Sequence, residues 1–131
     1  MFLIMRWMIC PCEGCYERLP EWTRPLQEQL NIAHPAWNDY VPWPIIRLRL
    51  ITVTPVQFEN YFVPFTEKLW VNWPSASDQV LLAAPRPDDA GAVKINPAFE
   101  IHLRELQHWS VASTFKASFP ELVDDTVRIK D

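Results

Sequence analysis

The residues with the clearest potential for chemistry are three cysteines in one short segment, Cys10, Cys12 and Cys15. Closely spaced thiols are typical zinc ligands, but a structural zinc site takes four ligands, commonly as two pairs. No fourth cysteine follows, and although His34 could complete the set, its spacing does not favour that arrangement. We therefore expect reduced thiols and neither a bound metal nor another cofactor, with these three cysteines as the metal candidates.

Histidines and carboxylates form no second constellation in the sequence. His102 and Glu105 have the i, i+3 spacing of half a carboxylate-bridged metal site, but the other half is missing. His102 and His108 lie six residues apart on or near one predicted helix, and so on different faces. The pairs Asp88-Asp89 and Asp124-Asp125 fall in predicted loops or tails, whereas glycosidase chemistry needs two carboxylates across a cleft. Without a Ser-His-Asp or Cys-His arrangement, we expect no enzyme.

Composition excludes further classes of protein. The 131 residues suffice for one domain, and 49% hydrophobic residues with seven tryptophans can supply its core. Only two glycines are present, so no Gly-rich phosphate loop, dinucleotide fingerprint or nucleophile elbow can be written. The net charge of −4 and the scattered basic residues predict no direct DNA binding by this chain alone.

The apolar opening, residues 1–9, is neither an export signal nor a membrane helix by its pattern. Arg6 interrupts it, no basic segment precedes it, and it has about half of the ~20 residues that a membrane helix needs. We expect no membrane association, and a start segment that packs on the domain or frays.

Thirteen prolines divide the chain into short elements, because proline fixes φ and lacks a backbone donor. In the first half of the chain, the pattern predicts a helix over 24–30, an extended segment over 32–43, a buried helix or strand from Pro44, a capping box at 54–57 and a helix from Phe58 that Pro64 kinks or ends. In the second half, it predicts a half-turn through Leu69 and Trp70, a short helix near Val80–Leu82, a surface loop over 84–92, a helix from Asn96-Pro97 to Trp109, and a helix over 110–119.

These elements predict an all-α fold, a single compact domain of short Pro-delimited helices with long loops. Residues 1–15 form the start segment, residues 16–128 the helical domain and residues 129–131 a tail. Large side chains at helical spacing or at the helix junctions are the expected structural core: Trp37, Trp43, Trp73, Phe99, Leu103, Leu106, Trp109, Phe115 and Phe119.

The proline- and tryptophan-rich blocks also carry a family resemblance. Residues 34–47, with Pro35, Trp37, Asp39, Pro42, Pro44 and Arg47, match the pattern hPxWxDxxPxPxxR. Tyr16–Trp22 and Gln29–Ala33 precede this block, and Val71–Pro74, Ile95–Ser110, Phe115 and Phe119–Leu122 follow in order. Together they resemble a fungal domain of unknown function that follows the basic-leucine-zipper region in fungal transcription factors. The resemblance covers about Tyr16 to Arg128.

The resemblance implies a non-catalytic regulatory domain of a nuclear transcription factor, with a protein as its partner; without it, we expect an intracellular protein. The basic region and the zipper of that family are not in this sequence, which contains no heptad series. A domain excerpt, a truncated product and a stand-alone regulator all fit.

Two other functions stay open at this point. An aromatic-lined helical cavity could bind a small apolar effector. Alternatively, Cys10, Cys12 and Cys15 could make the chain a metal-binding module.

Overall fold

The computed structural model describes residues 2–52, 57–83 and 93–131, and of Phe2, Phe58 and Ala83 only the backbone. The predicted surface loop lies outside these ranges, and so does the predicted capping box except for Gln57, which directly precedes α5. The elements in chain order are α1 (Phe2–Ile9), α2 (Glu13–Glu17), η1 (Glu21–Thr23), α3 (Gln27–Asn31), η2 (Ala36–Tyr40), α4 (Pro44–Thr52), α5 (Phe58–Lys68), β1 (Leu69–Val71), η3 (Ser77–Val80), β2 (Leu81–Ala83), β3 (Val93–Ile95), α6 (Pro97–Leu103), η5 (Leu106–His108), β4 (Trp109–Ala112), α7 (Ser113–Ser118) and β5 (Ile129–Lys130).

The prediction of an all-α fold is wrong, because the described residues form two small sheets as well as helices. Helices predominate, but β1, β4 and β5 make a three-stranded sheet in the order β1-β4-β5, and β2 pairs with β3. Leu69 pairs antiparallel with Val111, which in turn pairs parallel with Ile129. A strand of two to four residues shows no periodicity that separates it from a helical turn, and its partners lie far along the chain. The fold class is therefore α+β.

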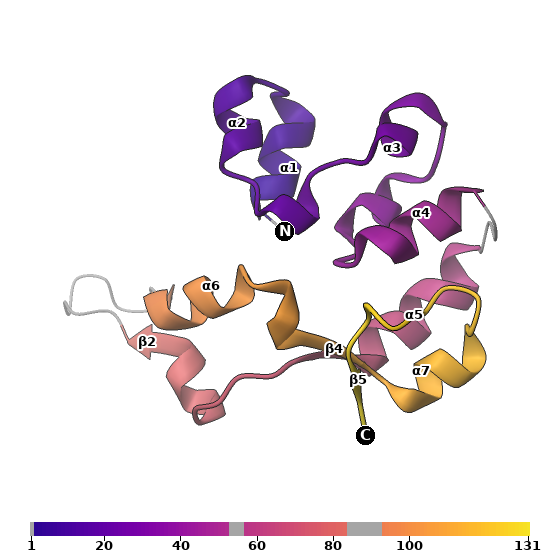
Figure 1. Cartoon of the computed structure of the whole chain (residues 1–131). Helices are drawn as coiled ribbons and strands as arrows, with labels where there is room; N and C mark the ends of the chain where they lie inside the picture. Colours follow the sequence, from indigo (N-terminus) through magenta and orange to yellow (C-terminus); the bar gives the residue numbers. More distant parts are fainter. Residues whose placement is uncertain (1, 53–56, 84–92) are drawn as a thin grey trace.

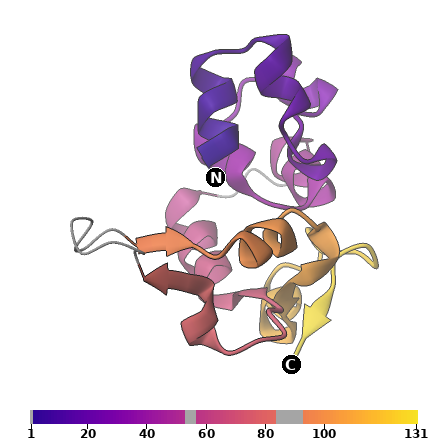
Figure 2. The ribbon, with the colours of Figure 1, turned by 90° about the vertical axis from the view of Figure 1, so that its left-hand side faces the viewer.

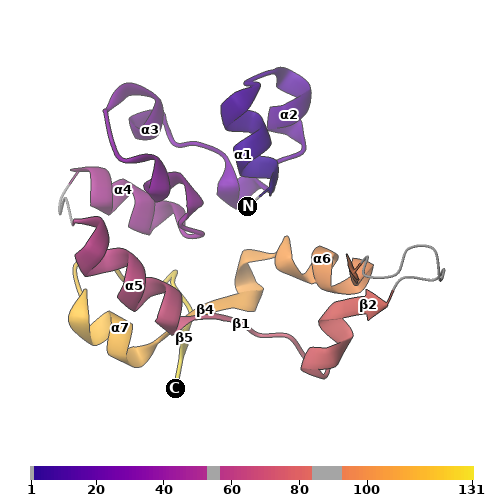
Figure 3. The same cartoon turned by 180° about the vertical axis from the view of Figure 1, so that it is seen from behind.

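The elements lie in two layers, which Figures 1 and 2 show from directions 90° apart. Helices α1 to α4 form the upper layer, and the part of the chain from α5 to β5 lies below them. In the lower layer, β2 and α6 extend to one end, while α5 and α7 lie side by side at the other (Figure 3). Within the described ranges, no helix combines the length and the apolar character needed to cross a membrane.

The hydrophobic core sits where α4 meets α5, α7 and β4. Tyr61 is fully buried, stacks on Phe65 at 5.3 Å between ring centroids and meets Phe115 edge to face at 5.8 Å. Trp43 touches Phe65 edge to face at 6.5 Å. Offset and edge-to-face rings are the favourable geometries for aromatic pairs. The core residues are Val41, Trp43, Ile46, Leu50, Tyr61, Phe65, Val111, Phe115, Leu122, Val123 and Val127.

The residues expected from the sequence to form the core occupy three different places. Trp43 and Phe115 are fully buried in it. Packed against its edge and partly buried are Trp37, Leu106, Trp109 and Phe119. Trp73, Phe99 and Leu103 are half-buried and stand outside this cluster, with the ring of Trp73 5.1 Å from that of Phe99.

Several element boundaries differ from the sequence prediction. Helix α5 continues through Pro64 to Lys68, and the predicted half-turn at Leu69 is strand β1. The helix that begins after Asn96 ends at Leu103, although its cap is as predicted, with the Asn96 side chain accepting from the Ala98 N–H at 2.9 Å.

The two ends of the chain are also built into regular structure. In the described part of the start segment, residues Phe2–Ile9 form α1 and Glu13 begins α2, and Ile4 and Cys15 are buried. Ile129 and Lys130, expected to be a tail, pair with β4 because β4 has a free edge opposite β1.

Candidate functional site

The cysteines converge at the turn between α1 and α2. The Cys12 N–H donates to the Cys10 carbonyl at 2.8 Å, and the Cys15 N–H donates to the Cys12 carbonyl at 3.0 Å. This compact turn brings the three sulfur atoms within 4.8 Å of one another. Cys10 and Cys12 are exposed, Cys15 is buried, and all three are free thiols. The sequence predicted the candidates, and the turn supplies the convergence that spacing alone did not establish.

The thiols differ in acidity because they share hydrogen bonds. A hydrogen bond from the Cys15 thiol lowers the pKa of Cys12, since it stabilises the thiolate. The hydrogen bond with Cys12 and the charges of its neighbours raise the pKa of Cys10. Cys12 therefore loses its proton before Cys10, and a thiolate is the form that binds metals.

Residues 34–47, which carry the family resemblance, take part in a hydrogen-bond network centred on Arg47. This residue is 1% exposed although it lies in the first turns of α4. Its guanidinium donates to Oε1 of Gln29 and to the carbonyls of Trp22, Arg24, Val41 and Pro42, at 2.9 to 3.3 Å. Burial lowers the pKa of Arg47 to about 10, so the group stays charged at neutral pH. One side chain thus ties the segments before α3 and after η2 to α4.

Asp39 organises the other end of the same network. It accepts hydrogen bonds from Nε2 of Gln29 at 2.5 Å and from Nε2 of His34 at 2.9 Å. Nδ1 of His34 meets the Ile32 carbonyl at 2.8 Å, so both ring nitrogens face acceptors. Burial opposes protonation of His34, but these two hydrogen bonds and the Asp39 charge outweigh it and raise its pKa. Gln29, His34 and Asp39 thus hydrogen-bond to one another, which is typical of residues with a structural role.

The histidines placed on different faces by the sequence pattern lie together in the structure. The His102 and His108 rings stack with centroids 3.6 Å apart and planes 2° apart. The chain leaves the helix after Leu103 and turns back through η5, which brings His108 over His102. His102 Nε2 meets the Asn72 carbonyl and His108 Nδ1 meets the His102 carbonyl, each at 2.9 Å. Because both partners are carbonyls, these nitrogens donate, and the two hydrogen bonds stabilise the turn.

Asp124 serves local structure as well. It accepts from the N–H and hydroxyl of Thr126, and it meets Arg49 of α4 at 3.3 Å. The Thr126 hydroxyl and the Arg49 charge contribute to a pKa of Asp124 below its usual range. The pair Asp88-Asp89 lies outside the described residues.

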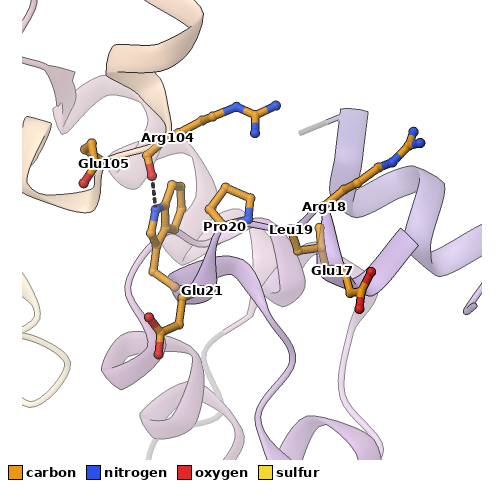
Figure 4. Close-up of a pocket in the computed structure, with 8 residues that line it drawn as sticks. Glu17, Arg18, Leu19, Pro20, Glu21, Arg104 and Glu105 are labelled. Atoms are coloured by element: carbon orange, nitrogen blue, oxygen red, sulfur yellow. Dashed lines mark hydrogen bonds between the residues drawn. The ribbon is translucent and has the colours of Figure 1, made fainter. Parts of the chain in front are cut away.

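One pocket, of about 380 Å³, lies between the segment after α2 and the end of α6 (Figure 4). The Trp22 Nε1–H donates to the Arg104 carbonyl at 2.7 Å across it. Its wall consists of Glu17, Arg18, Leu19, Pro20, Glu21, Trp22, Arg104 and Glu105. Five of these eight side chains are charged, so the pocket does not favour the apolar effector considered from the sequence.

A further surface was not predicted at all. The paired strands β2 and β3 with helix α6 form an extension, here called the arm, at the end of the lower layer opposite α5 and α7 (Figure 1). Its exposed large apolar residues are Leu81, Leu82, Val93, Ile95 and Ile101, which are 44–67% exposed. Leu81 and Ile95 are a cross-strand pair on one face of the two-stranded sheet. Exposed apolar residues on neighbouring elements, such as this cross-strand pair, are typical of interaction sites.

These features together define a small α+β domain, organised by a buried arginine network and carrying a thiol cluster and an apolar arm. The match to a family profile extends over residues 2–130, nearly the whole chain. The chain therefore belongs to the family described as a domain of unknown function, DUF3425. No curated protein and no solved structure matches it.

Proposed function

We propose that this chain is a non-catalytic regulatory or interaction domain of the kind found in fungal zipper-type transcription factors, that it acts in the nucleus, and that it binds a protein partner through the arm. The observation that carries the proposal is the exposed apolar surface of the arm, with Leu81 and Ile95 paired at 52% and 53% exposure. Apolar side chains in such numbers on a projecting element cost hydration free energy unless a partner covers them.

The polar residues of the proline- and tryptophan-rich block, residues 34–47, support a structural role for this block, distinct from the partner-binding role of the arm. Arg47 and Asp39 are hydrogen-bonded to other groups of the chain, and these contacts order the upper layer. Because these two side chains are engaged within the chain, we assign partner binding to another surface, the arm. The net charge of −4 supports a protein partner over direct DNA contact, because phosphate binding draws on a basic face.

The test compares capture of nuclear proteins by three forms of the chain. In the arm variant, Leu81→Thr and Ile95→Thr place β-branched residues, which suit strands, at both positions but remove the apolar pair. In the control variant, Leu30→Gln and Val63→Gln remove apolar side chains of similar exposure, 59% and 53%, from helices elsewhere. We expect a partner that the wild type and the control capture equally and that the arm variant loses. Equal capture by all three forms would contradict the assignment to the arm.

A thiol-based function is a second candidate, because the structure brings three sulfur atoms together.

A further inference from the structure

We propose that Cys10, Cys12 and Cys15 form a three-thiolate site for a single thiophilic metal ion, with Cu(I) as the ion that it fits. The inference rests on the thiol cluster alone and stands apart from the protein-binding role of the arm. It begins from the convergence of the three sulfur atoms, which all lie within 4.8 Å of one another.

The distances suit one ion after a small adjustment. Metal–thiolate bonds of about 2.3 Å place ligand sulfur atoms about 3.8–4.0 Å apart in tetrahedral or trigonal geometry. The cysteine side chains therefore need to close by no more than about 1 Å, which rotation about the Cα–Cβ bonds of two exposed residues can supply. No rearrangement of α1 or α2 is required.

The number of ligands favours Cu(I) over zinc. Among the residues that the structure describes, no other cysteine, histidine or carboxylate joins the group. Zinc in structural sites is four-coordinate, whereas soft thiolates select Cu(I), which is satisfied by three of them in a plane.

The binding step balances as an exchange of protons for the metal. One Cu(I) ion forms three copper–sulfur bonds, and the three thiols release their protons to the solvent. No electron is transferred, so no oxidant or reductant takes part. The site gains a net charge of −2, and bound metal joins the end of α1 to the start of α2.

The experiment titrates the reduced full-length chain with Cu(I), without oxygen, against a chromophoric Cu(I) chelator. We expect one Cu(I) per chain, release of protons on binding, and three sulfur neighbours in the copper X-ray absorption spectrum. Cys10→Ser and Cys12→Ser, at exposed positions, should each weaken Cu(I) binding at least about 100-fold, because loss of a residue that merely orients a metal ligand already costs up to that much. Unchanged far-ultraviolet circular dichroism shows that each variant folds.

Met8→Leu is the matched control, since it removes a half-exposed thioether from the adjoining helix α1. It should leave the affinity unchanged. The proposal is overturned if Cu(I) binds no more tightly to the wild type than to Cys12→Ser, or if the absorption spectrum shows two sulfur neighbours. If the wild type binds Zn²⁺ more tightly than Cu(I), with an oxygen or nitrogen atom as the fourth zinc ligand, the choice of Cu(I) is overturned.

Discussion

At the residue scale, the most instructive side chain is Arg47. From its sequence it is one of two nearby basic residues in an apolar segment, yet it is buried and saturated while Arg49 meets Asp124 at the surface. A buried guanidinium is tolerated because every donor direction finds a carbonyl or an amide oxygen. The family pattern contains Arg47 and not Arg49, but the sequence could not show that Arg47 is buried, since its partners come from segments that meet only in the fold.

Replacing Arg47 tests this role directly. Arg47→Lys keeps the charge but loses the planar donor fork, so several buried carbonyls lose their partners. We expect a loss of about 3 kcal/mol in the free energy of unfolding, measured by urea denaturation. Arg49→Lys is the control, and it should change the same free energy by less than about 1 kcal/mol. Equal effects of the two substitutions would contradict the network.

For Tyr61 we expect a substitution to leave the free energy of unfolding unchanged or to raise it. Its hydroxyl is fully buried among aromatic rings and has no hydrogen-bond partner among the described residues, and burial raises its pKa. Tyr61→Phe removes an unsatisfied group without changing the ring, so we expect equal stability or a gain of up to about 1 kcal/mol. A melting temperature well below that of the wild type would reveal a hydrogen bond at this hydroxyl.

His34 gives the network a defined pH dependence. Because its pKa is raised in the folded state, its contribution to stability is complete below its unfolded pKa near 6.5 and is lost as pH rises through the folded value. His34→Gln should therefore lower the melting temperature more at pH 5.5 than at pH 8.5. A difference that grows toward high pH would have the wrong sign.

At the element scale, sequence patterns predicted the helices better than the strands. Pro44 and Asn96-Pro97 mark the starts of α4 and α6, because caps and first-turn prolines act locally. The segment around Trp109 was predicted as helix throughout, yet it turns through η5 into β4. Its strand character depends on β1 and β5, which supply partners that no local pattern contains.

Trp109 is the residue that joins these elements. It leads into β4, its Nε1–H donates to the Leu103 carbonyl at 3.0 Å, and its ring lies 6.0 Å from that of Trp22. Trp109→Ala should lower the free energy of unfolding by about 3 kcal/mol, at the low end for a large aromatic because the side chain is half-buried. Trp70→Ala, at a 49% exposed position in β1, is the control and should cost clearly less. An unchanged urea midpoint for Trp109→Ala would show that this junction does not stabilise the fold.

At the scale of the whole molecule, the sequence allowed membership of a family of unknown function and the predominance of helix to be predicted, but not the surface. Residues 2–130 match the family profile, in line with the order of the Pro- and Trp-rich blocks. The arm could not be predicted, because the sequence does not show that apolar residues such as Leu81, Val93 and Ile95 are exposed. The thiol cluster was predicted in part. The sequence indicated Cys10, Cys12 and Cys15 as candidates, but only the structure of the turn shows that their sulfur atoms converge.

The most direct test of the proposed function is photo-crosslinking from single exposed positions of the full-length chain in nuclear extract. One chain carries a photoreactive side chain at Ile101 of α6, which is 67% exposed, and a second carries it at Val63 of α5, which is 53% exposed. We expect a discrete protein adduct from Ile101 and none from Val63. The same adducts from both positions, or none from Ile101, would contradict the assignment of partner binding to the arm.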